Sequence, residues 1–168
     1  MKSHKTKVVT FKRKREGKTD YNKRIKLLAS NMPRLVIRKS LKNITAQIVE
    51  YNTNGDKVTA SAHSRELIKM GWKGYRRNLP AAYLVGLLCG VRAKQKGLTG
   101  AVLDLGLYKS VKGSIFYAAV KGVLDAGVNV PHDVSVVPPE DRLVGAHTKN
   151  PDEAKKNYEK VKHSILKG

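Results

Sequence analysis

The chain has 168 residues, 40% of them hydrophobic, which is enough for one domain with a buried core. It carries 34 Lys and Arg against 13 Asp and Glu, a formal net charge of +21. A single cysteine excludes an internal disulfide and favours a reducing compartment. We expect neither secretion nor membrane insertion, because the sequence has no N-terminal apolar segment and no 18-residue apolar run.

The positive charge is concentrated near the N-terminus. Residues 1–42 hold fifteen Lys and Arg and only two acids, Glu16 and Asp20. Clustered basic residues favour a phosphate-rich partner, since each neutralised phosphate releases bound counterions. The alternative is a charged surface that only keeps the chain soluble, although such surfaces usually mix both signs.

The first elements in chain order are a basic arm and a helix. Residues 1–18 lack apolar periodicity, so we expect no fixed structure there without a partner. Thr19 or Asp20 can cap a helix that ends near residue 31. Its spacing predicts Tyr21, Ile25 and Leu28 on one face.

Three short strands are predicted next, over residues 35–37, 44–49 and 57–62. The Asn54-Gly55 pair between the second and third favours a hairpin, and the three runs together indicate an antiparallel meander. A helical turn over residues 65–70 then leads into a basic loop over 71–78. Aromatic and guanidinium groups in this loop could stack on unpaired bases, or Trp72 could pack on the domain and leave only Arg76 and Arg77 to contact phosphate.

The second half of the domain alternates helices and strands. Asn78 as cap and Pro80 in the first turn predict a long helix to about residue 96. Its apolar middle, with Gly86 and Gly90 four residues apart, indicates burial against another backbone. A buried strand over 101–105, a helix over 114–126 and a short edge strand over 128–130 complete the pattern. The fold class is α/β, a mixed sheet of a three-strand antiparallel meander plus a parallel strand, covered by helices.

The C-terminal region is predicted to be a loop followed by a helix. Residues 131–150 hold three of the six prolines and should run over the surface. The last helix, from residue 150, carries Ala154, Tyr158, Val161 and Ile165 on one face, which must pack on the domain or on another macromolecule. The predicted division is therefore a basic RNA-binding arm (1–18), an α/β domain (19–130), a surface loop (131–149) and a C-terminal helix (150–168).

Catalysis is poorly supported by the sequence. Asp104 is the only acid between Glu66 and Asp125, and it stands at a strand end, where Asp often caps the next loop. The five histidines show no metal-ligand spacing, and Cys89 lies in an apolar run typical of a buried side chain. We predict no catalytic residue, no metal site, no cofactor and no enzymatic activity. A basic ribonuclease and a free-standing RNA chaperone are the alternatives.

Several motifs occur in a recognisable order: RKREGKTDY at 13–21, PRLVIRKS at 33–40, ASAHS at 60–64, GW at 71–72, NLPAAYL at 78–84, VLDLG at 102–106 and GAH at 145–147. This pattern resembles the family of universal large-subunit ribosomal protein eighteen, in its archaeal type. The resemblance implies a ribonuclease-H-like topology. It also implies a structural constituent of the cytoplasmic ribosome that binds 5S rRNA, helps attach it to 23S-type rRNA in the central protuberance, and contacts neighbouring ribosomal proteins.

The resemblance also implies which residues contact RNA. They lie on the arm, the first helix and the first strand with its turn: Lys12, Arg13, Lys14, Arg15, Lys18, Thr19, Tyr21, Arg24, Arg34, Arg38, Lys39, Ser40, Lys42 and Asn43.

Overall fold

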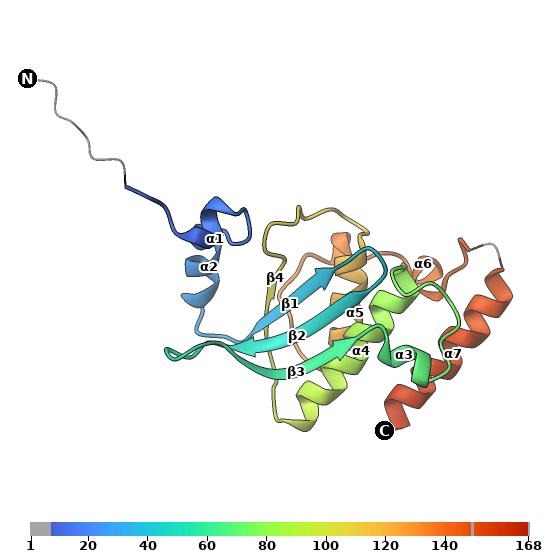
Figure 1. The fold of residues 1–168 in the computed structure, drawn as a ribbon. Coiled ribbons are helices and arrows are strands. Elements are labelled where there is room, and N and C mark those ends of the chain that lie inside the picture. The colour runs from blue at the N-terminus through green and yellow to red at the C-terminus, as the bar shows by residue number, and fades with distance from the viewer. Residues whose placement is uncertain (1–7, 149, 168) are drawn as a thin grey trace, which may run out of the picture.

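The computed structural model describes residues 8–148 and 150–167. Four strands form one sheet: β1 (Arg34–Lys39), β2 (Ile44–Glu50), β3 (Lys57–His63) and β4 (Val102–Asp104), in the order β3-β2-β1-β4 (Figure 1). The first three strands are antiparallel, and β4 is parallel to β1. This mixed sheet confirms the predicted fold class, and its strand order is the one expected for a ribonuclease-H-like topology.

Alternation along the strands divides the sheet into two faces. On β1, Leu35 and Ile37 are fully buried, whereas Arg34, Val36 and Arg38 point to the opposite face. Ile48, opposite Leu35 on β2, is also fully buried. The core therefore lies on the face that packs against the helices.

Two helices cover that face. α4 (Leu79–Gln95) begins where the Asn78 side chain accepts a hydrogen bond from the N–H of Ala81 at 2.9 Å, as predicted. α5 (Ile115–Asp125) crosses α4 so closely that a Cβ on Gly86 would lie 2.0 Å from the carbonyl oxygen of Ala119. The predicted close approach of a second backbone to this glycine is confirmed.

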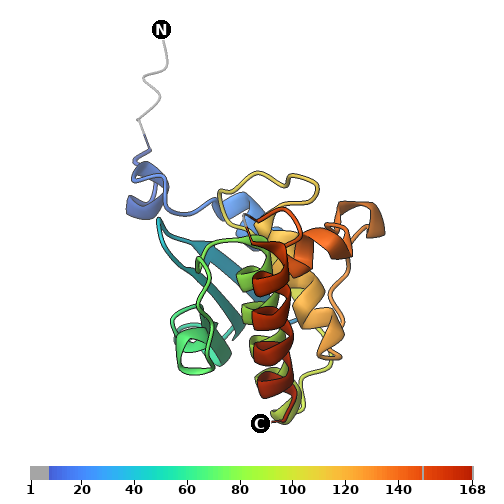
Figure 2. The ribbon, with the colours of Figure 1, turned by 90° about the vertical axis from the view of Figure 1, so that its right-hand side faces the viewer.

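The C-terminal helix packs on the domain. In α7 (Pro151–Lys167), Tyr158, Val161 and Ile165 are buried, and the ring of Tyr158 lies 5.5 Å from that of Tyr83 on α4. Figure 2 shows α7 lying along α4. The sequence left open whether this helix packs on the domain or on another macromolecule, and in the structure it packs on the domain.

The region predicted as an extended surface loop is partly helical. It contains a 3-10 turn (η1, Val134–Val136) and a short helix (α6, Glu140–Val144), while α3 (Glu66–Lys69) forms where a helical turn was expected. Leu143 is buried, and Gly145 ends α6 in the left-handed conformation. Residues 134–136 and 140–144 of the predicted surface loop are therefore helical, and Pro131, Pro138 and Pro139 lie before α6 and do not interrupt it.

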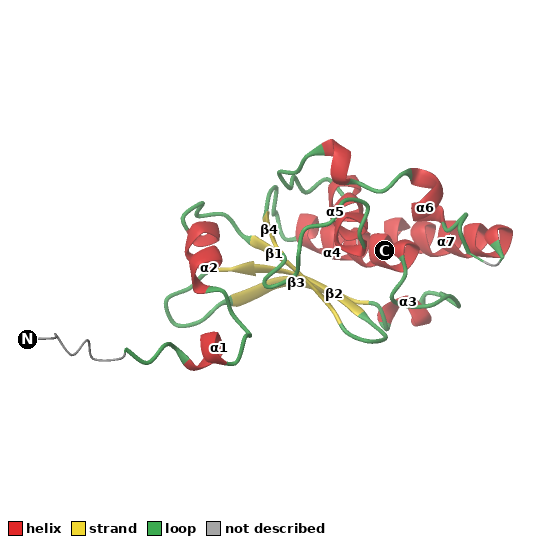
Figure 3. Cartoon of the chain, turned by 90° about the horizontal axis from the view of Figure 1, so that it is seen from above, coloured by secondary structure: helices red, strands yellow, loops and turns green. Residues whose placement is uncertain are grey.

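Two helices lie at one end of the sheet, away from α3 and α7 (Figure 3). α1 (Lys12–Arg15) occupies part of the arm for which no fixed structure was expected; residues 1–7 of that arm lie outside the described residues. α2 (Tyr21–Leu28) begins at Asp20, whose carboxylate accepts from two helical N–H groups. Ile25, which was predicted to share a face of this helix with Tyr21 and Leu28, is 65% exposed.

The predicted edge strand over 128–130 is reduced to a single bridge between Asn129 and Gly100. Cys89 is fully buried on α4, as expected. In the part of the chain that the structure describes, no helix is long and apolar enough to cross a membrane.

Candidate nucleic-acid interface

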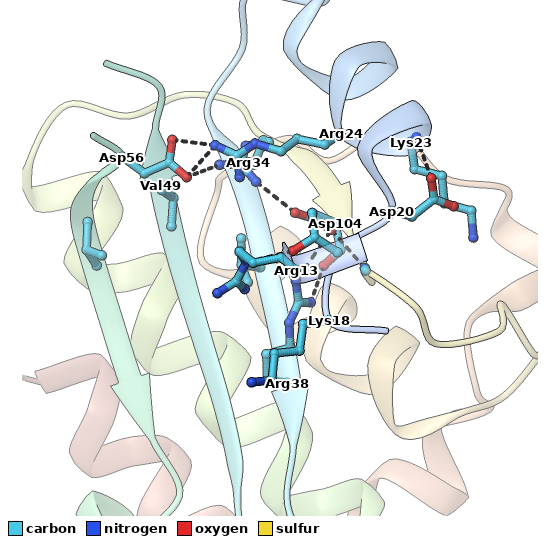
Figure 4. A pocket seen from close by; sticks show the side chains of 14 residues that line it. Arg13, Lys18, Asp20, Lys23, Arg24, Arg34, Arg38, Val49, Asp56 and Asp104 are labelled. Carbon is cyan, nitrogen blue, oxygen red and sulfur yellow. Dashed lines mark hydrogen bonds and ion pairs between the residues drawn. The ribbon is translucent and has the colours of Figure 1, made fainter. Parts of the chain in front are cut away.

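Basic side chains from four parts of the chain line one cavity of about 310 Å³ (Figure 4). The segment after α1 contributes Lys18 and Thr19, α2 contributes Lys23 and Arg24, and β1 contributes Arg34 and Arg38 on the sheet face opposite the core. Arg13 of α1 also lines the cavity. The carboxylates of Asp20, Asp56 and Asp104 lie among these cations.

Arg34 is the buried centre of this arrangement. Its side chain is 4% exposed and lies between two acids from distant parts of the chain. Nη2 donates to Asp56 Oδ2 at 2.7 Å, and Nη1 donates to Asp104 Oδ2 at 2.8 Å. A guanidinium held this way pairs with two carboxylates at once, and it is not presented at the surface.

Arg24 joins α2 to the β2–β3 hairpin through the same acid. Its Nη2 lies 2.9 Å from both oxygens of Asp56. Burial alone would raise the pKa of Asp56, but the hydrogen bonds and charges of Arg24 and Arg34 lower it below its usual value. Asp56 is therefore ionised at neutral pH and ties the helix to the sheet.

Arg38 is the more exposed of the two arginines on β1. Its Nη1 donates to the carbonyl oxygens of Asp104 and Ile37, at 2.9 and 3.0 Å, and its Nη2 lies 3.6 Å from Asp104 Oδ1. The side chain is nevertheless 43% exposed. An arginine anchored on one edge keeps further N–H groups for a planar anion such as phosphate.

The helix α1 presents exposed cations beside the cavity. Arg13 Nε donates to Thr19 Oγ1 at 2.9 Å, which folds the segment after α1 back toward the helix. The ammonium of Lys18 lies 2.8 Å from the carboxylate of Glu16, but its side chain is 61% exposed. Such an exposed ion pair contributes little to stability, so Lys18 can leave Glu16 and bind a phosphate. The Tyr21 ring packs on Phe11, with centroids 5.0 Å apart. The remaining candidates on α1, which are Lys12, Lys14 and Arg15, are all exposed.

The last four candidates lie outside this cavity, at the turn between β1 and β2. Ser40 and Asn43 close the turn through hydrogen bonds to each other, and Asn43 also accepts from Ser64. Lys39 lies 5.4 Å from the ring centres of Tyr108 and Phe116. Lys42 is exposed.

The loop over residues 71–78 lies against this turn. The hydroxyl of Tyr75 and Nη1 of Arg77 both donate to the carbonyl oxygen of Leu41, at 2.8 and 3.2 Å. Trp72 is only 4% exposed, so it packs on the domain. Residues 39–43 and 73–77 thus form a second basic surface, to which Lys73, Arg76 and Arg77 contribute.

Two further residues belong to this site that were not predicted as site residues. Lys23 on α2 is one of them, since it lines the cavity. Asp56, between β2 and β3, is the other, and its role depends on contacts with Arg24 and Arg34 that no local pattern contains. Asp104 does accept from the N–H of Gly106 at 2.8 Å, as its position at a strand end predicted.

The acids of the cavity are already engaged with protein groups. Asp20 caps α2, Asp56 holds two arginines, and Asp104 holds Arg34 and the following loop. Over residues 8–148 and 150–167, no three His, Cys, Asp or Glu side chains are grouped to hold a metal ion. The arrangement can bind anions through its exposed cations while the acids fix their positions.

The family described as "Ribosomal large subunit proteins 60S L5, and 50S L18" matches residues 5–99. The chain belongs to this family. The large ribosomal subunit protein uL18 of Methanococcus maripaludis is 54% identical over 142 residues, which cover 84% of this chain and 74% of the relative. These similarities confirm the predicted family and its archaeal type, and they make the chain a structural protein of the large ribosomal subunit with ribosomal RNA as a partner.

Proposed function

We propose that the protein binds 5S rRNA through the cavity at α1, α2 and β1. The observation that carries this proposal is the grouping of exposed cations from α1, α2 and β1 around acids that hold Arg24 and Arg38 in place. Such an array suits a folded RNA backbone, because phosphate contacts fix position without a recognition helix in a groove. Arg34 acts inside the protein, and the exposed residues make the RNA contacts.

The second basic surface supports a bridging role. Residues 39–43 and 73–77 are joined by the two hydrogen bonds to Leu41 and carry Lys42, Lys73 and Arg76. Two basic surfaces on one rigid domain can hold two RNA segments at a fixed spacing. We assign this second surface to the large-subunit rRNA, so that the protein attaches 5S rRNA to the subunit without catalysis. Neighbouring ribosomal proteins in the cytoplasmic ribosome are further partners.

Filter binding of a transcribed archaeal 5S rRNA tests the proposal. If six or more phosphates are contacted, affinity should fall about 1,000-fold or more between 50 and 200 mM salt. A double change, Arg13→Ala with Arg15→Ala, should weaken binding and make the log–log salt dependence shallower by about 2. The matched control, Lys155→Ala with Lys156→Ala on α7, removes the same charge elsewhere and should change affinity less. Absence of binding by the unaltered chain at moderate salt would refute the proposal.

A further inference from the structure

A second hollow, of about 470 Å³, adjoins the proposed RNA-binding cavity. Lys23, Asp104 and Gly106 line both. One wall of this hollow, called here the α2 groove, is the side of α2 that carries Lys26 and Leu27. The opposite wall is residues 103–110 with Tyr117 of α5. Among the residues that the structure describes, Lys23 is the only basic residue of the proposed RNA-binding cavity that also lines this groove.

The α2 groove has an apolar lining with a few polar groups. Leu27, Leu103 and Leu105 are half-buried, and Leu107 is 51% exposed. The hydroxyls of Ser110 and Tyr117, which line it, hydrogen-bond to each other. Sites that bury a flat ring commonly combine apolar walls with a small number of such groups.

The backbone of β4 adds hydrogen-bonding capacity. β4 is the edge strand of the sheet, and the N–H of Val102 faces β1, since it donates to the carbonyl oxygen of Pro33 at 2.8 Å. Successive backbone groups alternate in direction along a strand, so the N–H and C=O of Leu103 point away from β1. Leu103 lines the groove, so its N–H can donate to an acceptor on the edge of a base and its C=O can accept from a donor there.

The charge around the α2 groove is positive. Lys23, Lys26 and Lys109 line it and are all exposed. An apolar groove that is also lined by ammonium groups can bind a ligand in which an aromatic ring is joined to a phosphate. We propose that the α2 groove receives the base of an unpaired nucleotide in the bound rRNA, while these lysines contact the flanking phosphates. This inference rests on the RNA binding proposed above.

An acidic peptide paired with β4 is the competing occupant. The edge is short, because β4 spans only Val102–Asp104, so a peptide would gain few backbone hydrogen bonds. The groove also continues into the cavity lined by Arg13, Arg24 and Arg38. An RNA strand whose phosphates cross that cavity can place a neighbouring base in the groove without leaving the protein, which favours the nucleotide.

A neutral substitution in the groove wall tests the inference. Leu107→Asn removes an apolar contact without altering charge, and Leu166→Asn on α7 is the matched control, since Leu166 is 56% exposed. Each variant is measured for affinity to transcribed archaeal 5S rRNA and large-subunit rRNA fragments, and for reactivity of unpaired bases to dimethyl sulfate in the complex. Both positions are exposed, so circular dichroism should show an unchanged fold for both variants.

The expected result is about fivefold weaker binding for Leu107→Asn, an unchanged salt dependence, and one unpaired base that regains reactivity while the backbone footprint stays. Equal affinities for Leu107→Asn and Leu166→Asn would overturn the inference, as would the absence of any protected unpaired base. If Leu107→Asn binds RNA normally but enters reconstituted large subunits poorly, the groove receives a protein segment instead. Failure of the unaltered chain to bind RNA would refute the proposed function itself.

Discussion

Replacing Arg34 with methionine should destabilise the isolated protein by about 3 kcal/mol. Removing one partner of a buried ion pair typically costs about 3–5 kcal/mol, because the other charge stays buried without compensation. Here the side chain of Asp104 is 10% exposed and that of Asp56 is 26% exposed. The low end of the range applies because each acid keeps a second arginine, Arg38 at 3.6 Å and Arg24 at 2.9 Å.

The assay is urea unfolding followed by circular dichroism. With a slope of about 2–3 kcal/mol per molar, the midpoint of Arg34→Met should fall by about 1–1.5 M. Lys18→Met is the control, since it removes a cation from an exposed pair and should cost under about 1 kcal/mol. Adding Asp104→Asn to Arg34→Met should recover part of the loss, because the amide removes a buried negative charge whose remaining partner, Arg38, lies 3.6 Å away. Equal effects of Arg34→Met and Lys18→Met would show that the buried pair does not stabilise the fold.

Three further results are expected. The pKa of Asp56 is lowered in the folded state, so its contribution to stability is complete above about pH 4 and is lost as pH falls through the lowered value; Asp56→Asn should flatten this acid limb in unfolding experiments, and an unaltered limb would contradict the assignment. Gly86→Ala would place a Cβ 2.0 Å from the carbonyl oxygen of Ala119 and should cost more than about 3 kcal/mol in the free energy of unfolding, measured in urea. Gly100→Ala should cost much less, because its Cβ would meet the flexible tip of Met32 at 3.1 Å and the carbonyl oxygen of Asn129 at an ordinary contact distance of 3.6 Å. Burial raises the pKa of Cys89 to about 12, so this thiol should resist a disulfide reagent at pH 8 until the protein unfolds; rapid labelling of folded protein would contradict its burial.

The features that the sequence predicted well depend on neighbours in the chain. Asp20 and Asn78 cap their helices as expected, because a cap bonds to N–H groups two or three residues away. The strands followed from alternation, which assigns each side chain to a face. The short helix α6 was missed because the prolines before it, including Pro139 at its cap, dominate the local composition.

The site shows where local reasoning fails. Arg34 and Arg38 lie four residues apart on the same strand and the same face, so the sequence assigns them the same role. The structure separates them: Arg34 meets Asp56, 22 residues away, and Asp104, 70 residues away, and becomes buried. Arg38 lies further along the strand and stays 43% exposed. Only tertiary contacts distinguish an internal ion pair from a surface contact.

Added salt should stabilise the folded protein and weaken its binding to RNA. A net charge of +21 destabilises the compact chain through self-repulsion, and salt screens exposed charges much more than the buried pairs of Arg34. Raising KCl from 50 to 300 mM should increase the Tm of the isolated protein by a few degrees while it weakens RNA binding. Lys12→Glu with Lys14→Glu lowers the net charge by four and should reduce the rise in Tm. A Tm that falls with KCl would show that exposed ion pairs, and not repulsion among the cations, dominate the electrostatics of the folded chain.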